Sequence, residues 1–129
     1  MSVCKIGKIP LGRNRLVVIA GPCLAESAEM CKTIAATMAE ICQELDLGYV
    51  FKASYDKANR SSLNSYRSAG MATALEWIAQ AGRSVGCPTL TDVHETQQVG
   101  PAADLIDCLQ IPAFLCRQTD LLVEAGKSG

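Results

Sequence analysis

Basic and hydroxyl side chains crowd into residues 52–62, which read KASYDKANRSS. The segment carries Lys52, Lys57 and Arg60 against a single carboxylate, and it adds amide and hydroxyl donors. An arginine guanidinium offers paired N–H donors to a phosphate or carboxylate, whereas a lysine acts as a movable point charge. This many donors suit two anionic groups better than one phosphate. A solvated basic loop is the alternative, and we rank it lower because Lys52 ends an apolar run, where an unused lysine is costly to hold.

Cys23 is a second residue that could do chemistry. It follows Gly21 and Pro22, a pair that turns the backbone sharply after an apolar run. Its thiolate could serve as a nucleophile or as a metal ligand. The chain has no Cys-x-x-Cys motif and only one histidine, so no complete Cys/His metal site is visible. Spacing alone therefore favours a small buried apolar side chain at this position.

His94, the one histidine, lies in the segment TDVHE at residues 91–95. Strand alternation puts Asp92 and His94 on the same side of the chain. Asp92 could accept hydrogen bonds from substrate hydroxyls, and Glu95 is expected to cap the following helix. A structural role for His94 beside a carboxylate is about as plausible as a catalytic one.

Strand and helix patterns alternate along the chain, and these elements must position the polar residues. Short apolar runs predict strands, and helical spacing predicts helices, at residues 16–20, 27–45, 47–53, 71–85, 89–93, 95–99, 105–111 and 119–125 in turn. One apolar face is expected on the first helix, formed by Ile34, Met38, Ile41 and Leu45. Ser27 is the expected N-cap of that helix, and Thr119 is the expected cap of the last. The third helix is expected to break at Gly100 and Pro101.

Four consecutive βα units predict a parallel sheet with right-handed crossovers. An open doubly wound sheet and part of a (βα)8 barrel both fit this order. A complete barrel typically needs about 250 residues, and this chain has 129. In either architecture the polar segments follow the strands, at the carboxyl ends where such sheets build their sites.

Composition narrows the function classes. The chain is 49% hydrophobic and 19% charged, which is typical of one globular domain. A net charge of −1 and 5% aromatic residues argue against a nucleic-acid surface. No apolar run approaches the roughly 18 residues of a membrane span, and the charged N-terminus does not resemble an export signal. We therefore expect no membrane partner, a cytoplasmic location, and seven reduced cysteines that are mostly buried.

Three segments carry a family resemblance: residues 50–62 (VFKASYDKANRSS), 91–95 (TDVHE) and 110–120 (QIPAFLCRQTD). They resemble the 2-dehydro-3-deoxyphosphooctonate aldolases, also called 3-deoxy-D-manno-octulosonate 8-phosphate synthases. The sister family that makes a heptulosonate 7-phosphate has Lys-Pro-Arg-Thr where this chain has Lys-Ala-Asn-Arg-Ser-Ser. The resemblance implies a (βα)8 barrel, of which this single domain would form about the first four βα units. Residues 1–15 would be an N-terminal extension that caps the barrel bottom.

The resemblance also implies a reaction. Phosphoenolpyruvate condenses with arabinose 5-phosphate to give 3-deoxy-D-manno-octulosonate 8-phosphate and inorganic phosphate, in a pathway that feeds lipopolysaccharide. Water attacks C2 of the enol phosphate, C3 attacks the sugar aldehyde, and phosphate leaves by C–O cleavage. Matched motifs assign phosphoenolpyruvate to Lys52, Ser54, Lys57 and Gln110, the sugar phosphate to Asn59, Arg60 and Ser61, and the sugar side to Asp92. Among these, Lys52, Lys57 and Asp92 are the expected catalytic residues.

The family divides at the position of Cys23. One class has Asn there and needs no metal, whereas the other has Cys and uses a divalent metal ion, so the resemblance makes Cys23 a metal ligand. A His, a Glu and an Asp from later strands complete that metal site in the family, and these 129 residues contain none of the three. We therefore expect the isolated chain to be inactive and, because its strand edges are open, to form a homo-oligomer. Two alternatives stay open: a heptulosonate 7-phosphate synthase, and a non-catalytic half barrel that only binds phosphorylated ligands.

Overall fold

The computed structural model describes residues 3–12, 15–58, 62–64 and 66–129. Within these ranges, a central parallel sheet has the strand order β3-β4-β5-β6. Its strands are β3 (Val17–Ala20), β4 (Gly48–Lys52), β5 (Thr89–Asp92) and β6 (Cys108–Gln110). The helices are α1 (Ala28–Glu44), α2 (Met71–Val85), α3 (Thr96–Ala103) and α4 (Thr119–Lys127), with a 3₁₀ turn, η1, at Ala113–Leu115. An antiparallel hairpin of β1 (Lys5–Ile6) and β2 (Ile9–Pro10) precedes the sheet.

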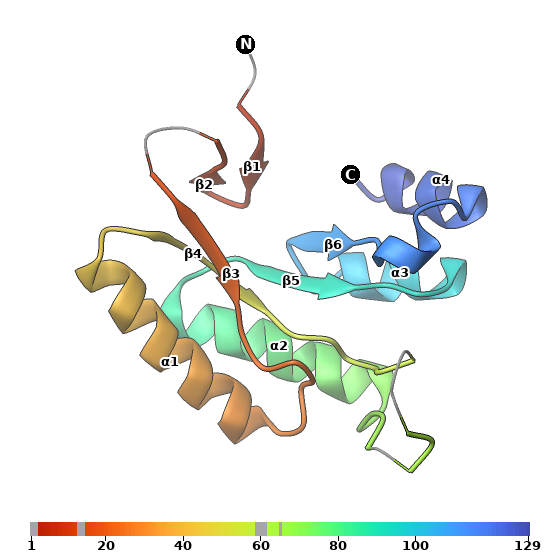
Figure 1. Cartoon of the computed structure of the whole chain (residues 1–129), viewed down its shortest axis with the longest axis horizontal. Helices are drawn as coiled ribbons and strands as arrows, with labels where there is room; N and C mark the ends of the chain where they lie inside the picture. The colour runs from red at the N-terminus through yellow and green to blue at the C-terminus, as the bar shows by residue number, and fades with distance from the viewer. Residues whose placement is uncertain (1–2, 13–14, 59–61, 65) are drawn as a thin grey trace.

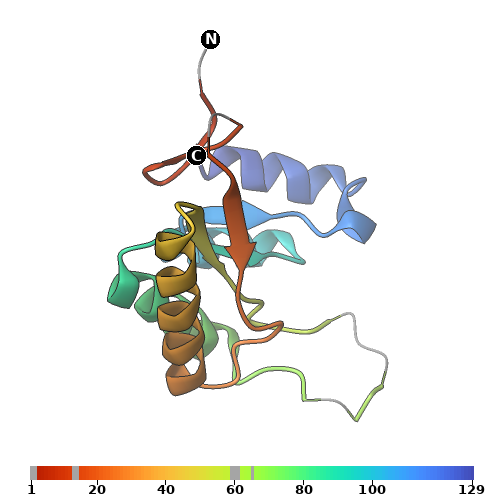
Figure 2. The ribbon, with the colours of Figure 1, turned by 60° about the vertical axis from the view of Figure 1, so that its left-hand side comes forward.

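The consecutive strand order distinguishes between the two predicted architectures. A doubly wound sheet reverses its strand order at a switch point and carries helices on both faces. Right-handed crossovers between consecutive strands instead put every helix on one face, as in a barrel. Figures 1 and 2 show α1 and α2 packed against the same face of the sheet. The chain thus forms about four βα units of a (βα)8 barrel.

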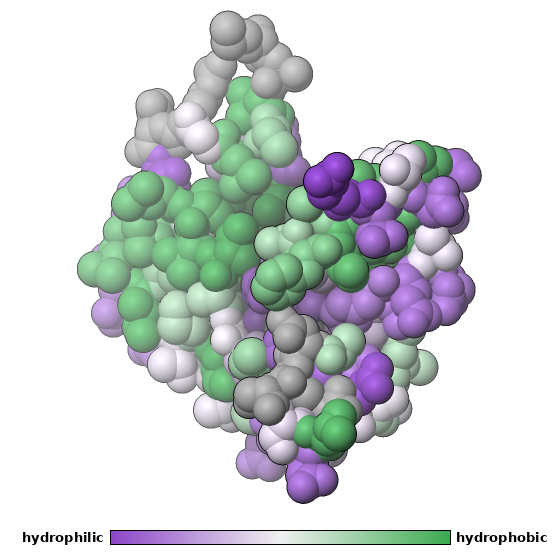
Figure 3. All heavy atoms as spheres, turned by 45° about the vertical axis from the view of Figure 1, so that its right-hand side comes forward, coloured by the Kyte–Doolittle hydropathy of each residue, from purple (hydrophilic) through white to green (hydrophobic). Residues whose placement is uncertain are grey.

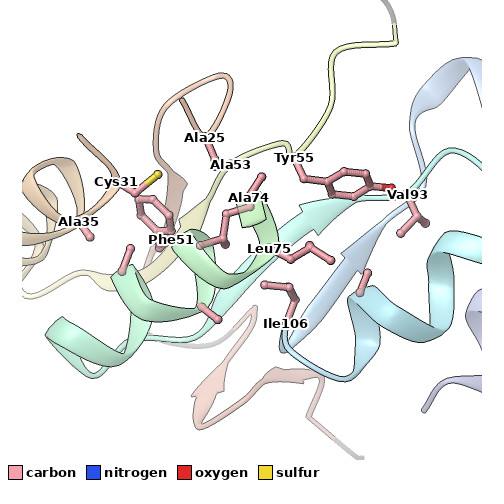
Figure 4. Packing of buried hydrophobic residues seen from close by; sticks show 14 of the residues in the cluster. Ala25, Cys31, Ala35, Phe51, Ala53, Tyr55, Ala74, Leu75, Val93 and Ile106 are labelled. Atoms are coloured by element: carbon pink, nitrogen blue, oxygen red, sulfur yellow. The ribbon is translucent and has the colours of Figure 1, made fainter. Parts of the chain in front are cut away.

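The sheet register divides the strand side chains between two faces. Tyr49 and Phe51 point toward α1 and α2 and are buried in the main core, which Figure 4 shows from close by. The opposite face is called the inner face here. Side chains alternate along each strand and paired residues share a face, so the register assigns these residues to the inner face: Val17, Ile19, Val50, Lys52, Leu90, Asp92, Cys108 and Gln110.

The N-terminal hairpin packs on the inner face toward the amino ends of the strands. Ile6 forms a buried cluster with Val50 and Leu90. Ile19, on the edge strand β3, is 44% exposed and Leu16 just before it is 78% exposed. Figure 3 shows hydrophobic side chains gathered below the N-terminal segment. Whether residues 1–15 cap a complete barrel stays a prediction.

Most of the predicted helices and strands are confirmed. The predicted N-cap of α1 is confirmed as well, because Ser27 Oγ accepts a hydrogen bond from the Met30 N–H at 3.1 Å. The predicted apolar face of α1 is partly wrong. Ile41 and Leu45 are exposed, whereas small residues on the adjoining face, Cys31 and Ala35, are fully buried. Because α1 packs against α2 as well as β4, close helix approach favours small side chains there.

Two other predictions about helix ends are wrong. The third helix does not break at Pro101 but continues to Ala103. Proline removes only one backbone donor there, and the Asp104 N–H still bonds to the Gly100 carbonyl at 3.1 Å. Gln118, and not Thr119, is the N-cap of α4.

The cysteines also differ from expectation in part. Across the described residues all seven are free thiols, as predicted. Only Cys31 and Cys42 are buried, however, and Cys4, Cys23 and Cys116 are exposed. In the same part of the chain, no helix is both long and apolar enough to cross a membrane.

Candidate active site

The chain after β3 runs beside the chain after β4, and this places Cys23 next to Ser54. The Ser54 N–H donates to the Cys23 carbonyl at 3.4 Å, and the Ala25 N–H donates to the Ser54 carbonyl at 2.9 Å. Gly21 permits this approach, because a Cβ there would lie 2.0 Å from the Lys52 carbonyl oxygen. The exposed Cys23 thiol and the buried Ser54 hydroxyl thus occupy one end of the sheet.

Lys52, Asp92 and Gln110 end three neighbouring strands on the inner face. Asp92 pairs with Gln110 in the register, and Lys52 pairs with Leu90, two residues before Asp92. The structure therefore brings these predicted site residues together at the carboxyl end of the sheet, although their roles stay predictions. Asn59, Arg60 and Ser61 lie outside the described residues.

Several polar contacts hold the described part of the loop after β4. Lys57 Nζ donates to Ser54 Oγ at 2.7 Å, so these two predicted phosphoenolpyruvate ligands form one unit. Arg67 donates two hydrogen bonds to the Asp56 carboxylate, at 2.8 and 3.0 Å, and its carbonyl accepts from the Lys57 N–H at 3.1 Å. The Arg67 charge is therefore balanced by Asp56.

Asp92 and His94 form a largely buried pair, with His94 Nε2 2.8 Å from Asp92 Oδ2. Burial raises the pKa of the Asp92 carboxyl, but hydrogen bonding to His94 and to the nearby Ser54 hydroxyl outweighs it, so the net pKa lies below its ordinary value. Asp92 is thus a carboxylate acceptor at neutral pH. Its Oδ1 and the Nδ1 of His94 are buried without a hydrogen-bond partner among the described residues.

An open pocket of about 500 Å³ adjoins this pair. Its lining comes from the loops after β4, β5 and β6: Asp56, Lys57, Ala58, Asp92, His94, Glu95, Pro112, Phe114 and Leu115. A buried acceptor needs a donor from a ligand or water. The pocket therefore suits a ligand with hydroxyl groups near Asp92 and an anionic group near Lys57.

Sequence reasoning missed Tyr55 and Gln98. The Tyr55 hydroxyl donates to Gln98 Oε1 at 2.7 Å, and burial raises the pKa of that hydroxyl, which keeps it a neutral donor. Gln98 stands three residues after Glu95, the N-cap of α3, and this Glu-x-x-Gln spacing is a recognisable capping pattern. The spacing could have identified Gln98, but no local signal links it to Tyr55.

The metal implied by the resemblance does not find a complete site. Among the residues that the structure describes, no three His, Cys, Asp or Glu side chains are placed to hold a metal ion together. Cys23 is the one resemblance-derived ligand present, and a lone exposed thiolate is too few donors for a stable divalent site. The described donor set therefore does not fit the metal.

Comparison with known proteins identifies the family of this chain. Residues 3–129 match the model of the DAHP synthetase I family. The chain is 51% identical over 114 residues to a 2-dehydro-3-deoxyphosphooctonate aldolase from Desulfotalea psychrophila, covering 88% of this chain and 41% of the relative. A protein of the same name from Koribacter versatilis is 48% identical over 125 residues, which cover 97% of this chain and 45% of the relative. Another from Wolinella succinogenes is 52% identical over 113 residues, which cover 88% of this chain and 43% of the relative. The chain spans less than half the length of these relatives. The chain therefore belongs to the DAHP synthetase I family.

Proposed function

We propose that the polypeptide carrying these residues condenses phosphoenolpyruvate with arabinose 5-phosphate. The products are 3-deoxy-D-manno-octulosonate 8-phosphate, a lipopolysaccharide precursor, and inorganic phosphate. The observation that carries the proposal is the convergence of Lys52, the Lys57–Ser54 unit and Gln110 at one end of the sheet. The names of the relatives support the proposed product, a 2-dehydro-3-deoxyphosphooctonate.

Each group is proposed for a role that suits its charge and hydrogen-bonding capacity. Lys52 and Lys57 compensate the charge of the enol phosphate and of the departing phosphate, with Ser54 and Gln110 as neutral partners. Asn59, Arg60 and Ser61 are proposed for the sugar phosphate. Asp92, held ionised beside His94, accepts a hydrogen bond from a sugar hydroxyl. Water adds to C2 of phosphoenolpyruvate while C3 forms the new C–C bond with the aldehyde carbon, whose oxygen takes a proton. The bond between C2 and the phosphate oxygen then breaks, which leaves a keto group at C2 and releases inorganic phosphate.

Phosphate release tests this proposal, with phosphoenolpyruvate and either arabinose 5-phosphate or erythrose 4-phosphate as the second substrate. We expect turnover with the five-carbon sugar. Turnover with erythrose 4-phosphate alone would favour the heptulosonate 7-phosphate synthase, an alternative that the family description itself supports. Phosphoenolpyruvate binding without turnover of either aldose would favour a non-catalytic binding protein.

Residues 1–129 expressed by themselves are proposed to bind phosphoenolpyruvate without a normal rate of turnover. The four strands described leave β3 and β6 as open edges, and such edges favour self-association. We therefore expect a mass above that of the monomer in light scattering. A monomer with rapid phosphate release would contradict both expectations.

Cys23 is proposed as one ligand of a divalent metal ion in the whole polypeptide that carries these residues, where further ligands are needed to complete the site. Cobalt titration tests this with a readout that does not depend on turnover, because a thiolate ligand gives a charge-transfer band. The Cys23→Ser variant should lack that band, whereas Cys116→Ser, also at an exposed cysteine, should keep it.

A cytoplasmic location is likewise a proposal, supported by the free thiols.

A further inference from the structure

We propose that Gln98 is a positioning residue that sets the spacing between the two halves of the active site. The inference rests on the proposed function, in which the loop after β4 binds phosphoenolpyruvate and the loop after β5 contacts the sugar. Gln98 itself touches neither substrate, since its side-chain oxygen is occupied by the protein.

One oxygen atom contacts both loops, in addition to the Tyr55–His94 ring contact and the Ser54–Asp92 hydrogen bond between them. Gln98 Oε1 accepts hydrogen bonds from the Tyr55 hydroxyl at 2.7 Å, the His94 N–H at 2.9 Å and the Glu95 N–H at 3.1 Å. A carbonyl oxygen has two lone pairs, so three donors saturate it. Two of these donors belong to the segment after β5, and the third comes from a residue 43 positions away in the chain.

Tyr55 transmits this contact to the phosphoenolpyruvate side. It directly follows Ser54, is 1% exposed, and has its ring 5.7 Å from the His94 ring. Figure 4 shows Tyr55 extending from the segment after β4 toward Val93. Its carbonyl also accepts a hydrogen bond from Ser68 Oγ at 2.8 Å, so the returning chain holds it in place. Tyr55 is therefore held on the side of the loop after β4, and loss of its hydrogen bond to Gln98 would free the segment after β5 to move relative to it.

The consequence is a fixed distance between two functional pairs. Ser54 and Lys57 flank Tyr55 in the loop after β4, and Asp92 and His94 belong to the segment whose amides donate to Gln98. The two pairs also meet directly, because the Ser54 hydroxyl hydrogen-bonds to the Asp92 carboxyl. Two reacting molecules must approach in a defined geometry, and a misplacement of about 1 Å can cost on the order of 100-fold in rate. Losing the acceptor should thus affect the joining of the substrates more than the binding of either one.

Steady-state kinetics of the whole polypeptide that carries these residues, with phosphoenolpyruvate and arabinose 5-phosphate, tests the role. Gln98→Leu should lower kcat roughly 10- to 100-fold while the KM for phosphoenolpyruvate changes little. Gln98→Glu should restore most of kcat, because glutamate serves equally well as the acceptor at the third position of a helix. Gln97→Leu, the same change at the exposed neighbouring position of α3, is the matched control and should match wild type. Unchanged kcat in Gln98→Leu, or equal loss in Gln98→Glu, would overturn the proposal.

Amide hydrogen exchange separates this inference from the proposed function. In Gln98→Leu the His94 and Glu95 amides should exchange faster, whereas core amides such as that of Phe51 keep their protection. Tyr55→Phe removes only one of the three donors, so both amides should stay protected while kcat falls by less. If wild type turns over neither aldose, the proposed function fails, yet amide exchange still decides whether Gln98 holds the segment. Equal exchange in Gln98→Leu and wild type would show that it does not.

Discussion

The inner face of the sheet changes character within two residues along three neighbouring strands. Apolar residues toward the amino ends give way to polar residues at the carboxyl ends: Val50 precedes Lys52, Leu90 precedes Asp92, and Cys108 precedes Gln110. The amino half lies under the N-terminal hairpin, where Val50 is 0% and Leu90 6% exposed. At the carboxyl ends, Asp92 instead lines the open pocket beside His94.

This difference separates stability from function on one surface. Side chains two residues apart in a strand share a face, so neighbouring positions are divided between a dry cluster and a polar rim. In βα barrels, residues at the carboxyl ends of strands serve catalysis and those at the amino ends serve stability. The four predictions below test that division, from the largest expected effect to the smallest.

Placing a carboxylate in the apolar half should be the most damaging change. Leu90→Asp buries an unpaired charge against Ile6 and Val50, and we expect the free energy of unfolding to fall by roughly 3–5 kcal/mol. Urea denaturation measures the loss, and Leu90→Met, which conserves volume, should cost less than about 1.5 kcal/mol. A stability close to wild type in Leu90→Asp would mean that this half is not dry.

Removing a charge from the polar half should affect binding and not folding. Lys52→Ala should weaken phosphoenolpyruvate binding by about tenfold or more, because a charge-assisted hydrogen bond is worth ~1.5–3 kcal/mol. Titration calorimetry measures this, and Lys32→Ala, at an exposed lysine of α1, provides the control. Equal affinities for Lys52→Ala and Lys32→Ala would exclude Lys52 from the site.

A stability loss outside both halves should leave binding untouched. Ser27→Ala removes the N-cap acceptor of α1, at a cost of about 1 kcal/mol in unfolding free energy. Phosphoenolpyruvate affinity should not change, and Ser27→Asp, which keeps an acceptor, should retain the stability. A weaker affinity in Ser27→Ala would show that global stability, and not the rim, controls binding.

The smallest expected effect concerns pH. The folded-state pKa of Asp92 is lowered, so its contribution to stability is complete above the ordinary carboxyl pKa of about 3.9 and is lost as pH falls through the lower folded value. Asp92→Asn should lack this part of the acid dependence. Urea denaturation of both proteins from neutral to acid pH measures the difference, and identical pH profiles would show that the His94 contact does not stabilise the carboxylate.

Local patterns in the sequence were enough to predict most helices and strands and the end of the sheet where polar residues gather. Apolar runs, the Ser27 cap and Gly86, in the left-handed conformation after α2, are short-range signals. The buried face of α1 was not predictable in the same way, because Cys31 and Ala35 are selected by packing against a distant helix. The continuation of α3 past Pro101 depends on its packing as well, since Val99 and Ala102 are buried.

Other features of the fold and of the candidate site could not be predicted from the sequence because they depend on long-range contacts. The consecutive strand order, which identifies the barrel, is a property of pairing between distant segments. The contact between Tyr55 and Gln98 joins residues 43 positions apart, and neither side chain has a sequence pattern that indicates the other. Lys52, Asp92 and Gln110 were predictable as a group because the matched family motifs include them and because each lies near the carboxyl end of a predicted strand.

A phosphoenolpyruvate titration followed by amide chemical shifts tests the central claim most directly. We predict that shifts will concentrate at Lys52, Ser54, Lys57 and Gln110, with little change at Ile6 or Val50. Shifts centred on the N-terminal hairpin and the apolar half, or no shifts at saturating ligand, would contradict the assignment of the carboxyl end as the anion-binding site.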